Sequence, residues 1–336
     1  SRRRNARSIR ESQQRLGNGG PRTQASARVL PRTAQGMATP GSERANGRFR
    51  FRFRPPTPRR NNLLTQQRTN VNILDEIADR TRRRIAKQKR DRPLSCVRAA
   101  AEAALARESG AGAFPFEEAL RQPGVRFIAE VKRASPSKGL IAPNFPYLQI
   151  ARDYEAAGAA AISCLTEPYW FQGRNEYLSE IAREVGIPVL RKDFVVDEYM
   201  VYEAKELGAQ AVLLICAILD DAQLIAYREL CDELGLSALV EAHTAREVER
   251  AVACGARVIG VNNRDLRTFT VDMKAAQALR DLVPAGTLFV SESGIKTAAD
   301  VQAARAMRAD AVLVGEALMR AEDKRAKLAE LRGSAV

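Results

Sequence analysis

The chain has 336 residues and a formal net charge of +14, but residues 1–70 alone carry +15 through 17 Arg and two acidic residues. Because the rest of the chain is close to neutral, the basic balance is no argument that a folded domain binds nucleic acid. The longest strongly apolar run, residues 211–219, is far shorter than the ~20 residues of a membrane-spanning helix, which argues against a membrane protein.

The segment 1–70 is poor in apolar residues and rich in Arg, Gln, Asn, Pro and Gly, as in FRFRFRPPTPRRNN at 49–62. Such a composition cannot bury enough surface to offset its ordering entropy, so we expect a disordered basic tail. It is a solvated tail, an upstream translated extension or a functional arm. The start at Ser1 without Met favours the first two. The functional alternatives are an RNA- or membrane-seeking arm and an organelle transit peptide.

Helical patterns at 72–121 predict an N-terminal helical extension. Residues 73–91 place Ile73, Ile77, Thr81 and Ile85 on one stripe, with charged residues around the rest. A second helix is expected to begin with Ser95 as its N-cap, and a short third one covers residues 116–120. We expect these helices to pack on the domain that follows, within one folded unit at 71–335.

Short apolar runs then alternate with amphipathic helices at intervals of about 20 to 30 residues, as in a repeat architecture. The predicted strands are 126–132, 160–167, 188–194, 211–217, 237–243, 257–263, 287–294 and 311–318. Gly158, Gly208 and Gly255 each precede a strand and fit the left-handed position at which helices commonly stop. Eight strands joined by crossover helices predict an α/β fold, a closed (β/α)8 TIM barrel, in preference to a doubly wound sheet.

Nearly every predicted strand ends in an ionisable or amide side chain. In this fold the chemistry lies at the C-terminal ends of the strands and in the loops that follow. These positions hold Glu130 and Lys132, Glu167, Lys192 and Asp193, Glu241 and His243, Asn262 and Asn263, Glu292 and Ser293, and Gly315 and Glu316. One such charge could be a solvated strand end, but several that converge on one mouth must pair or serve a polar ligand.

The last two strands predict a phosphate site. Ser293 and Gly294 stand shortly before a helix, and Gly315 opens a short helical turn. Glycine allows close approach of the backbone to a ligand, and the loops after strands seven and eight recurrently bind phosphate in this fold.

Six segments together carry a specific resemblance. They are EVKRASPSKG (130–139), LRKDF (190–194), LVEAH (239–243), VNNRDL (261–266), SESGI (291–295) and VGEALM (314–319). Over about residues 72–330 the chain resembles indole-3-glycerol-phosphate synthase, an enzyme of tryptophan biosynthesis. The resemblance implies a carboxy-lyase that closes the pyrrole ring of 1-(2-carboxyphenylamino)-1-deoxyribulose 5-phosphate with loss of carbon dioxide and water. It also implies that no metal and no organic cofactor take part.

Residue by residue, the resemblance implies that Lys192 is the general acid for ring closure and Glu241 a partner carboxylate or base. Lys132 would hold the substrate carboxylate and Glu130 would pair with it, although the division of proton transfers between the two lysines stays open. The resemblance also implies that Asn262 and Glu292 orient the substrate hydroxyls and the lysines, and that Arg264 is a charge at or behind the mouth. Phe194 and Leu213 would contact the aromatic ring. The phosphate would be bound by Ser135, Ser293, Gly294, Gly315 and the Glu316 backbone. His243 is expected to be a packed residue, and the 135–139 loop either a lid or a flexible surface loop.

Two other functions were considered. Another phosphate-binding barrel, such as phosphoribosylanthranilate isomerase or the α-subunit of tryptophan synthase, would need different groups on the first strand; the isomerase uses a Cys and Asp pair, where this chain has Glu130 and Lys132. A non-catalytic RNA-binding protein with a degenerate barrel would not need the full set of mouth residues. Five scattered cysteines without a CxxC pair indicate reduced thiols and a cytoplasmic protein, and we expect a monomer without nucleic-acid partners.

Overall fold

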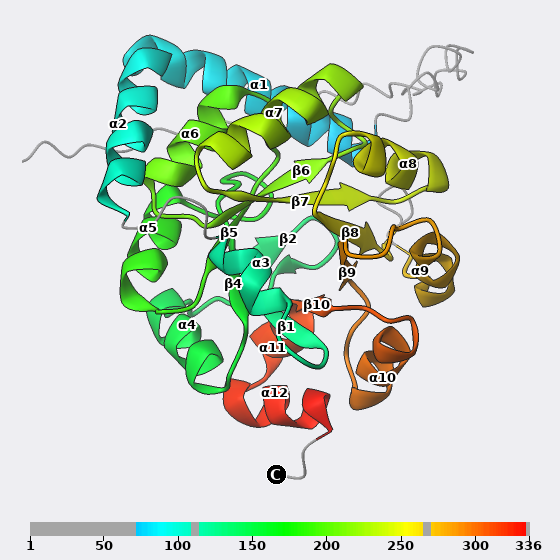
Figure 1. Ribbon diagram of the computed structural model, residues 1–336. Helices are drawn as coiled ribbons and strands as arrows, with labels where there is room; N and C mark the ends of the chain where they lie inside the picture. Colours follow the sequence, from blue (N-terminus) through cyan, green and yellow to red (C-terminus); the bar gives the residue numbers. More distant parts are fainter. Residues whose placement is uncertain (1–71, 109–113, 265–269, 334–336) are drawn as a thin grey trace, which may run out of the picture. The chain divides into compact units, whose positions relative to one another are not determined.

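The structure, a computed structural model, describes residues 72–108, 114–264 and 270–333. The tail predicted for residues 1–70 lies outside the described residues. Figure 1 shows a ring of parallel strands surrounded by helices, and the strand order closes on itself as β1-β10-β9-β8-β7-β6-β5-β4. The predicted (β/α)8 barrel is therefore confirmed.

The barrel strands are shorter than the predicted runs, because residues at one or both ends of each run belong to the connecting segments. They are β1 (Arg126–Val131), β4 (Ala161–Leu165), β5 (Val189–Lys192), β6 (Ala211–Ile215), β7 (Ser237–Ala242), β8 (Val258–Asn262), β9 (Leu288–Glu292) and β10 (Ala311–Val314). Every residue of β4, β6, β7, β9 and β10 is buried, as expected of parallel strands covered by helices on one face and filled by side chains on the other. The ring closes where β1 pairs with β10, with Arg126 opposite Ala311.

A helix follows each strand and returns the chain to the base of the barrel. These helices are α4 (Tyr147–Ala156), α5 (Asn175–Glu184), α6 (Glu198–Glu206), α7 (Asp221–Glu233), α8 (Ala245–Ala253), α9 (Met273–Arg280), α10 (Ala298–Ala306), the short α11 (Glu316–Arg320) and α12 (Lys324–Arg332). Gly158, Gly208 and Gly255 have φ angles of 79°, 89° and 78°, which confirms the predicted left-handed helix stops. None of the described helices is both long and apolar enough to cross a membrane.

Three helices precede the barrel: α1 (Ile73–Asp91), α2 (Leu94–Arg107) and α3 (Pro115–Leu120). The prediction that Ser95 caps the second helix is wrong, because α2 begins at Leu94 with Pro93 as its N-cap and has no side-chain cap. The fixed φ of proline suits that boundary without a capping side chain. Helix α3 covers the base of the barrel, where the Glu117 carboxylate accepts hydrogen bonds from Ser237 Oγ at 3.1 Å and Arg257 Nε at 3.0 Å.

The loop after β1 contains ordered structure that the sequence did not predict. Strands β2 (Ala134–Ser135) and β3 (Gly139–Leu140) form a small antiparallel hairpin. The amide N–H of Ala134 donates to the Phe171 carbonyl at 3.3 Å, so the hairpin is attached to the loop that follows β4. This segment is therefore a docked hairpin over the C-terminal side of the barrel.

Candidate active site

A cavity of about 730 Å³ lies at the C-terminal ends of the strands. Its lining includes all fourteen residues that the sequence singled out for a role: Glu130, Lys132, Ser135, Lys192, Phe194, Leu213, Glu241, Asn262, Arg264, Glu292, Ser293, Gly294, Gly315 and Glu316. These residues lie on seven of the eight barrel strands or in the segments that follow them, all but β4, and their convergence follows from closure of the ring. Their individual chemical roles stay predictions.

Lys192 lies between two buried carboxylates. Its Nζ donates to Glu241 Oε2 at 3.1 Å and lies 3.6 Å from Glu292 Oε2, while Asn262 Nδ2 donates to Glu241 Oε1 at 3.3 Å. Burial alone would lower the pKa of Lys192, but the charges of Glu241 and Glu292 outweigh it and raise that pKa. Burial opposes ionisation of Glu241 as well, yet Lys192 and His243 hold its pKa below the ordinary value. The pair is therefore an ammonium and a carboxylate at neutral pH.

Glu292 differs from Glu241 although both carboxylates face Lys192. Burial and then the nearby charge of Glu241 raise the pKa of Glu292 to about 8. Glu292 Oε1 is buried and has no hydrogen-bond partner within the described part of the chain, which adds to the cost of its charged form. At neutral pH the carboxyl group of Glu292 is therefore protonated, and it can donate a hydrogen bond that Glu241 cannot.

This difference predicts a pH dependence. The pKa of Glu292 is raised above its ordinary value, so the neutral form is present below about pH 8 and is lost as the pH rises through that value. We expect kcat/KM of the wild type to fall above about pH 8, and Glu292→Gln, which keeps a neutral donor, to lose this alkaline limb. The measurement is a pH profile of kcat/KM for both proteins; identical alkaline limbs would assign the titration to another group.

A second lysine–glutamate pair stands on the opposite side of the cavity, at the end of β1. Lys132 Nζ forms an ion pair and hydrogen bond with Glu130 Oε1, and the two side chains are 15% and 6% exposed. Gly315 lies directly beside them: a Cβ atom at Gly315 would overlap the Glu130 carboxylate and lie 2.9 Å from Lys132 Nζ. The close approach of β10 to this pair therefore requires glycine at position 315.

The turn after β9, where the phosphate site is predicted, has a left-handed backbone held by a side-chain amide. Ser293 and Gly294 both have positive φ, 64° and 89°. The side-chain amide of Asn263 fixes this turn by donating to the carbonyls of Glu292 at 2.9 Å and Ser293 at 3.0 Å. A non-glycine residue in the left-handed region is uncommon and often marks a functional position, which agrees with the prediction for Ser293.

Several residues of the cavity were not predicted from the sequence. Helix α1 contributes Ile73, Leu74 and Ile77 to the lining, and the loop after β4 contributes Phe171, whose ring centroid is 6.1 Å from that of Phe194. The helical stripe of α1 was visible in the sequence, but its contact with the mouth depends on long-range packing. The cavity therefore has an aromatic and aliphatic wall opposite its charged groups.

Lys138 also lines the cavity, at the tip of the β2–β3 hairpin. Its Nζ lies 3.6 Å from the Glu316 carboxylate, which also accepts from Arg320 at 3.1 Å. Lys138 belongs to the SPSKG segment that the sequence analysis noted. The sequence did not indicate that Lys138 pairs with Glu316. The hairpin tip therefore lies next to the start of α11.

His243 does not line the cavity. Its imidazole stands between Glu241 Oε1 at 3.5 Å and Glu247 Oε2 at 3.4 Å. Burial opposes its charge, but Glu247 and Glu241 raise the pKa of His243. The two carboxylates thus favour its charged form, and its place outside the cavity lining is in keeping with the expectation of a packed residue.

The fold and the cavity define a class, the (β/α)8-barrel enzymes that act on phosphorylated small molecules. Residues 74–331 match the family model described as indole-3-glycerol phosphate synthase. The chain therefore belongs to the indole-3-glycerol phosphate synthase family, whose members are carboxy-lyases. This assignment separates it from the other phosphate-binding barrel families considered from the sequence.

Individual relatives agree with the family match. Proteins named indole-3-glycerol phosphate synthase from Ruminiclostridium cellulolyticum and Lachnoclostridium phytofermentans are 52% and 48% identical to this chain. The matches cover 78% and 77% of this chain and 100% and 98% of those relatives. A solved 3-hexulose-6-phosphate synthase from Salmonella typhimurium aligns with a TM-score of 0.52 at 13% identity over 62% of this chain and 97% of that chain, which shows a common barrel fold alone.

Proposed function

We propose that this chain converts 1-(2-carboxyphenylamino)-1-deoxyribulose 5-phosphate to indole-3-glycerol phosphate, carbon dioxide and water. One observation supports the proposal above the others: two lysine–glutamate pairs and a fixed glycine turn face one cavity. Ring closure needs a proton donor at the ribulose carbonyl, a cation for the substrate carboxylate, and an acid and a base for dehydration. The cavity offers each of these groups.

Lys192 is proposed as the acid that protonates the carbonyl oxygen while the aromatic carbon attacks. The carboxylates beside it keep its ammonium form populated, and Glu241 can accept a proton because it is ionised. Glu292 in its neutral form and Asn262 would orient the substrate hydroxyls. This arrangement separates a base from a neutral donor within one cluster.

Lys132 is proposed to bind the carboxylate that leaves as carbon dioxide, with Glu130 as its counter-charge. Lys132 lines the same cavity as Lys192, and it would also serve as a proton donor in the dehydration step. The apolar wall of Phe194 and Leu213 would hold the aromatic ring. Ser135, Ser293, Gly294, Gly315 and the Glu316 backbone would bind the phosphate, and Arg264 would supply charge at the mouth.

The experiment is a fluorescence assay for indole-3-glycerol phosphate with the synthetic substrate and the purified full chain. The dephosphorylated substrate serves as the matched control, and we expect its KM to be much higher because it lacks the dianion. Absence of product from the phosphorylated substrate under conditions in which the protein is folded would overturn the proposal.

The basic segment is proposed to have no part in catalysis. Removing residues 1–70 should leave kcat and KM within about twofold, because every cavity residue lies in the described part of the barrel and its helices. An RNA-binding function would instead be lost when residues 1–70 are removed. A gel-shift measurement that compares RNA binding by the full chain and by the truncated chain tests this. Loss of turnover on truncation would contradict the assignment of the whole activity to residues 71–335.

We further propose that the protein acts as a monomer in the cytoplasm. Its five cysteines are free, and four of them are buried, which suits a reducing compartment. Light scattering at working concentration tests the oligomeric state, and a mass corresponding to a dimer would overturn the first part of the proposal.

A further inference from the structure

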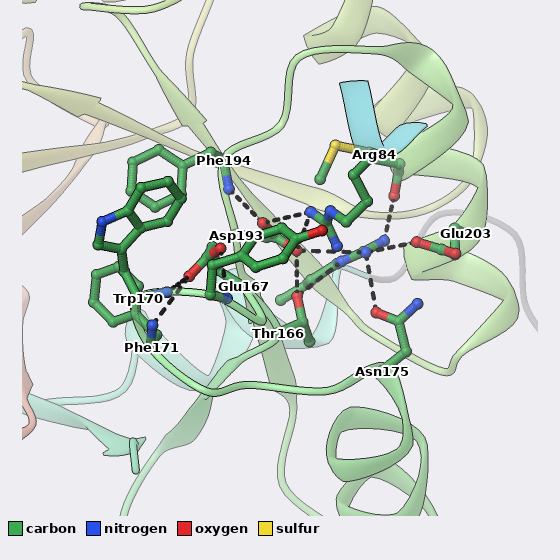
Figure 2. Close-up of polar contacts among 12 residues, drawn as sticks. Arg84, Thr166, Glu167, Trp170, Phe171, Asn175, Asp193, Phe194 and Glu203 are labelled. Atoms are coloured by element: carbon green, nitrogen blue, oxygen red, sulfur yellow. Dashed lines mark hydrogen bonds and ion pairs between the residues drawn. The ribbon is translucent and has the colours of Figure 1, made fainter. Parts of the chain in front are cut away.

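Arg84 on helix α1 reaches from outside the barrel to a buried carboxylate at the end of β5. Its Nη2 lies 3.2 Å from both carboxylate oxygens of Asp193, and the two side chains are 11% and 0% exposed. Asp193 follows Lys192 directly in the chain. Figure 2 shows Arg84 pointing toward Asp193 and a network of further polar groups around that carboxylate.

The residues on both sides of Lys192 are fixed by this network. Lys192 points into the cavity, whereas Arg191 bonds to groups of α6. Asp193 also contributes to the cavity lining, but its carboxylate bonds to Arg84 of α1. Asp193 accepts from Thr166 Oγ1 at 2.7 Å and from the Phe194 amide at 2.8 Å. Arg191 donates to the Met200 carbonyl at 2.8 Å and to Glu203 Oε2 at 2.6 Å. The backbone that carries Lys192 is therefore held from behind.

Arg84 supplies one of the two cations that face Asp193. Arg191 is 3.6 Å from Asp193 but makes its shorter contact, 2.6 Å, with Glu203. Two buried carboxylates thus share Arg191, and Arg84 supplies the second cation. Without Arg84, Asp193 would keep a charge in a fully buried position with one distant counter-ion, and such a group must shift or draw in water.

The carboxylate of Glu167 extends the network toward the apolar wall. It accepts backbone hydrogen bonds from Tyr169 at 2.9 Å, Trp170 at 2.7 Å and Phe171 at 3.0 Å (Figure 2). Arg80, one turn before Arg84 on α1, lies over the Tyr169 ring at 3.9 Å. Helix α1 therefore contacts both the strand end that carries Lys192 and the loop that carries Phe171.

We propose that Arg84 is a positioning residue for Lys192, acting through Asp193, and that α1 thereby sets the geometry of the acid in ring closure. The inference rests on the proposed function, because it concerns the acid of that reaction. Lys192 must lie within hydrogen-bond reach of the substrate carbonyl while it stays close to Glu241. A displacement of about 1 Å at such a site can lower the rate by about 10²-fold without removing any catalytic group.

The test compares Arg84→Met with Arg82→Met, a matched control on the same helix. Arg82 is 48% exposed and pairs with Asp79, which is 64% exposed, so its loss should leave kcat unchanged. Arg84→Met should lower kcat per folded molecule about tenfold or more with KM changed by less than about threefold, since binding groups remain in place. Arg84→Lys, which keeps a cation, should recover much of that loss.

A double variant separates positioning from stability. Arg84→Met combined with Asp193→Asn removes the unpaired charge, so it should regain thermal stability relative to Arg84→Met while its kcat stays low. A purely structural role predicts a lower Tm for Arg84→Met with normal kcat per folded molecule, and that result would overturn the inference. If the wild type itself gives no product, the proposed function fails; if it turns over and Arg84→Met matches it, only the role of Arg84 fails.

Discussion

Lys192→Ala is expected to lower kcat by about 10²–10⁴-fold, the contribution typical of a positioned general acid. The variant loses the ammonium that lies 3.1 Å from Glu241 and 3.6 Å from Glu292. KM should change little, because the phosphate cradle and the apolar wall do not involve Lys192. Steady-state kinetics by product fluorescence measures both constants.

The same substitution leaves two buried carboxylates without their cation. Their pKa values should both rise, so the variant should be less stable above neutral pH than below it. Thermal unfolding at several pH values therefore has to accompany the kinetics, and kcat is to be compared per folded molecule. Near-normal turnover of a folded Lys192→Ala protein would remove this residue from the acid role.

Gly315→Ala is expected to lower kcat/KM by about 10²-fold or more, through kcat as well as KM. From the sequence, a larger residue here would only weaken phosphate binding. The structure adds a second effect, because the new Cβ would overlap the Glu130 carboxylate and approach Lys132 Nζ to 2.9 Å. One methyl group would thus displace the ion pair that faces the substrate carboxylate.

Gly186→Ala is the matched control for that substitution. Its Cβ would meet only the Glu155 carboxylate, at 3.4 Å, and it lies outside the cavity lining. It should therefore leave both constants unchanged. Unaltered kcat and KM in Gly315→Ala would show that neither the phosphate nor the pair on β1 depends on this glycine.

Much of the site could be predicted because parallel strands that close into a ring bring their C-terminal ends together. Once eight aliphatic runs are recognised, Lys192, Glu241 and Glu292 must share a mouth, whatever the details of packing. The cavity lining agrees with that reasoning for the fourteen residues given a role, whereas Glu167, His243 and Asn263, which also stand at strand ends, do not line the cavity. The sequence pattern could not, however, show which lysine pairs with which glutamate. Nor could it show that the pKa values of Glu241 and Glu292 shift in opposite directions, because this depends on burial and on the charges around each carboxyl group.

Features that depend on distant segments were missed. Phe171 enters the cavity because its loop folds around the Glu167 carboxylate, and Arg84 reaches Asp193 across 109 positions of sequence. The wrong N-cap at Ser95 has a local cause. Pro93 itself occupies the N-cap position, so the helix begins two residues earlier than a cap at Ser95 would place it. The amino-acid pattern of a segment indicates that it forms a helix. The residues that the helix contacts are decided by the folded topology.

The pairing of β1 with β10 has a consequence for synthesis of the chain. The first strand leaves the ribosome early, but its partner on that side is the last strand of the barrel, with Arg126 opposite Ala311. Until β10 is made, β1 and β9 each present an open row of backbone donors and acceptors, the kind of edge at which chains associate with one another. A nascent chain stalled before residue 311 should therefore aggregate.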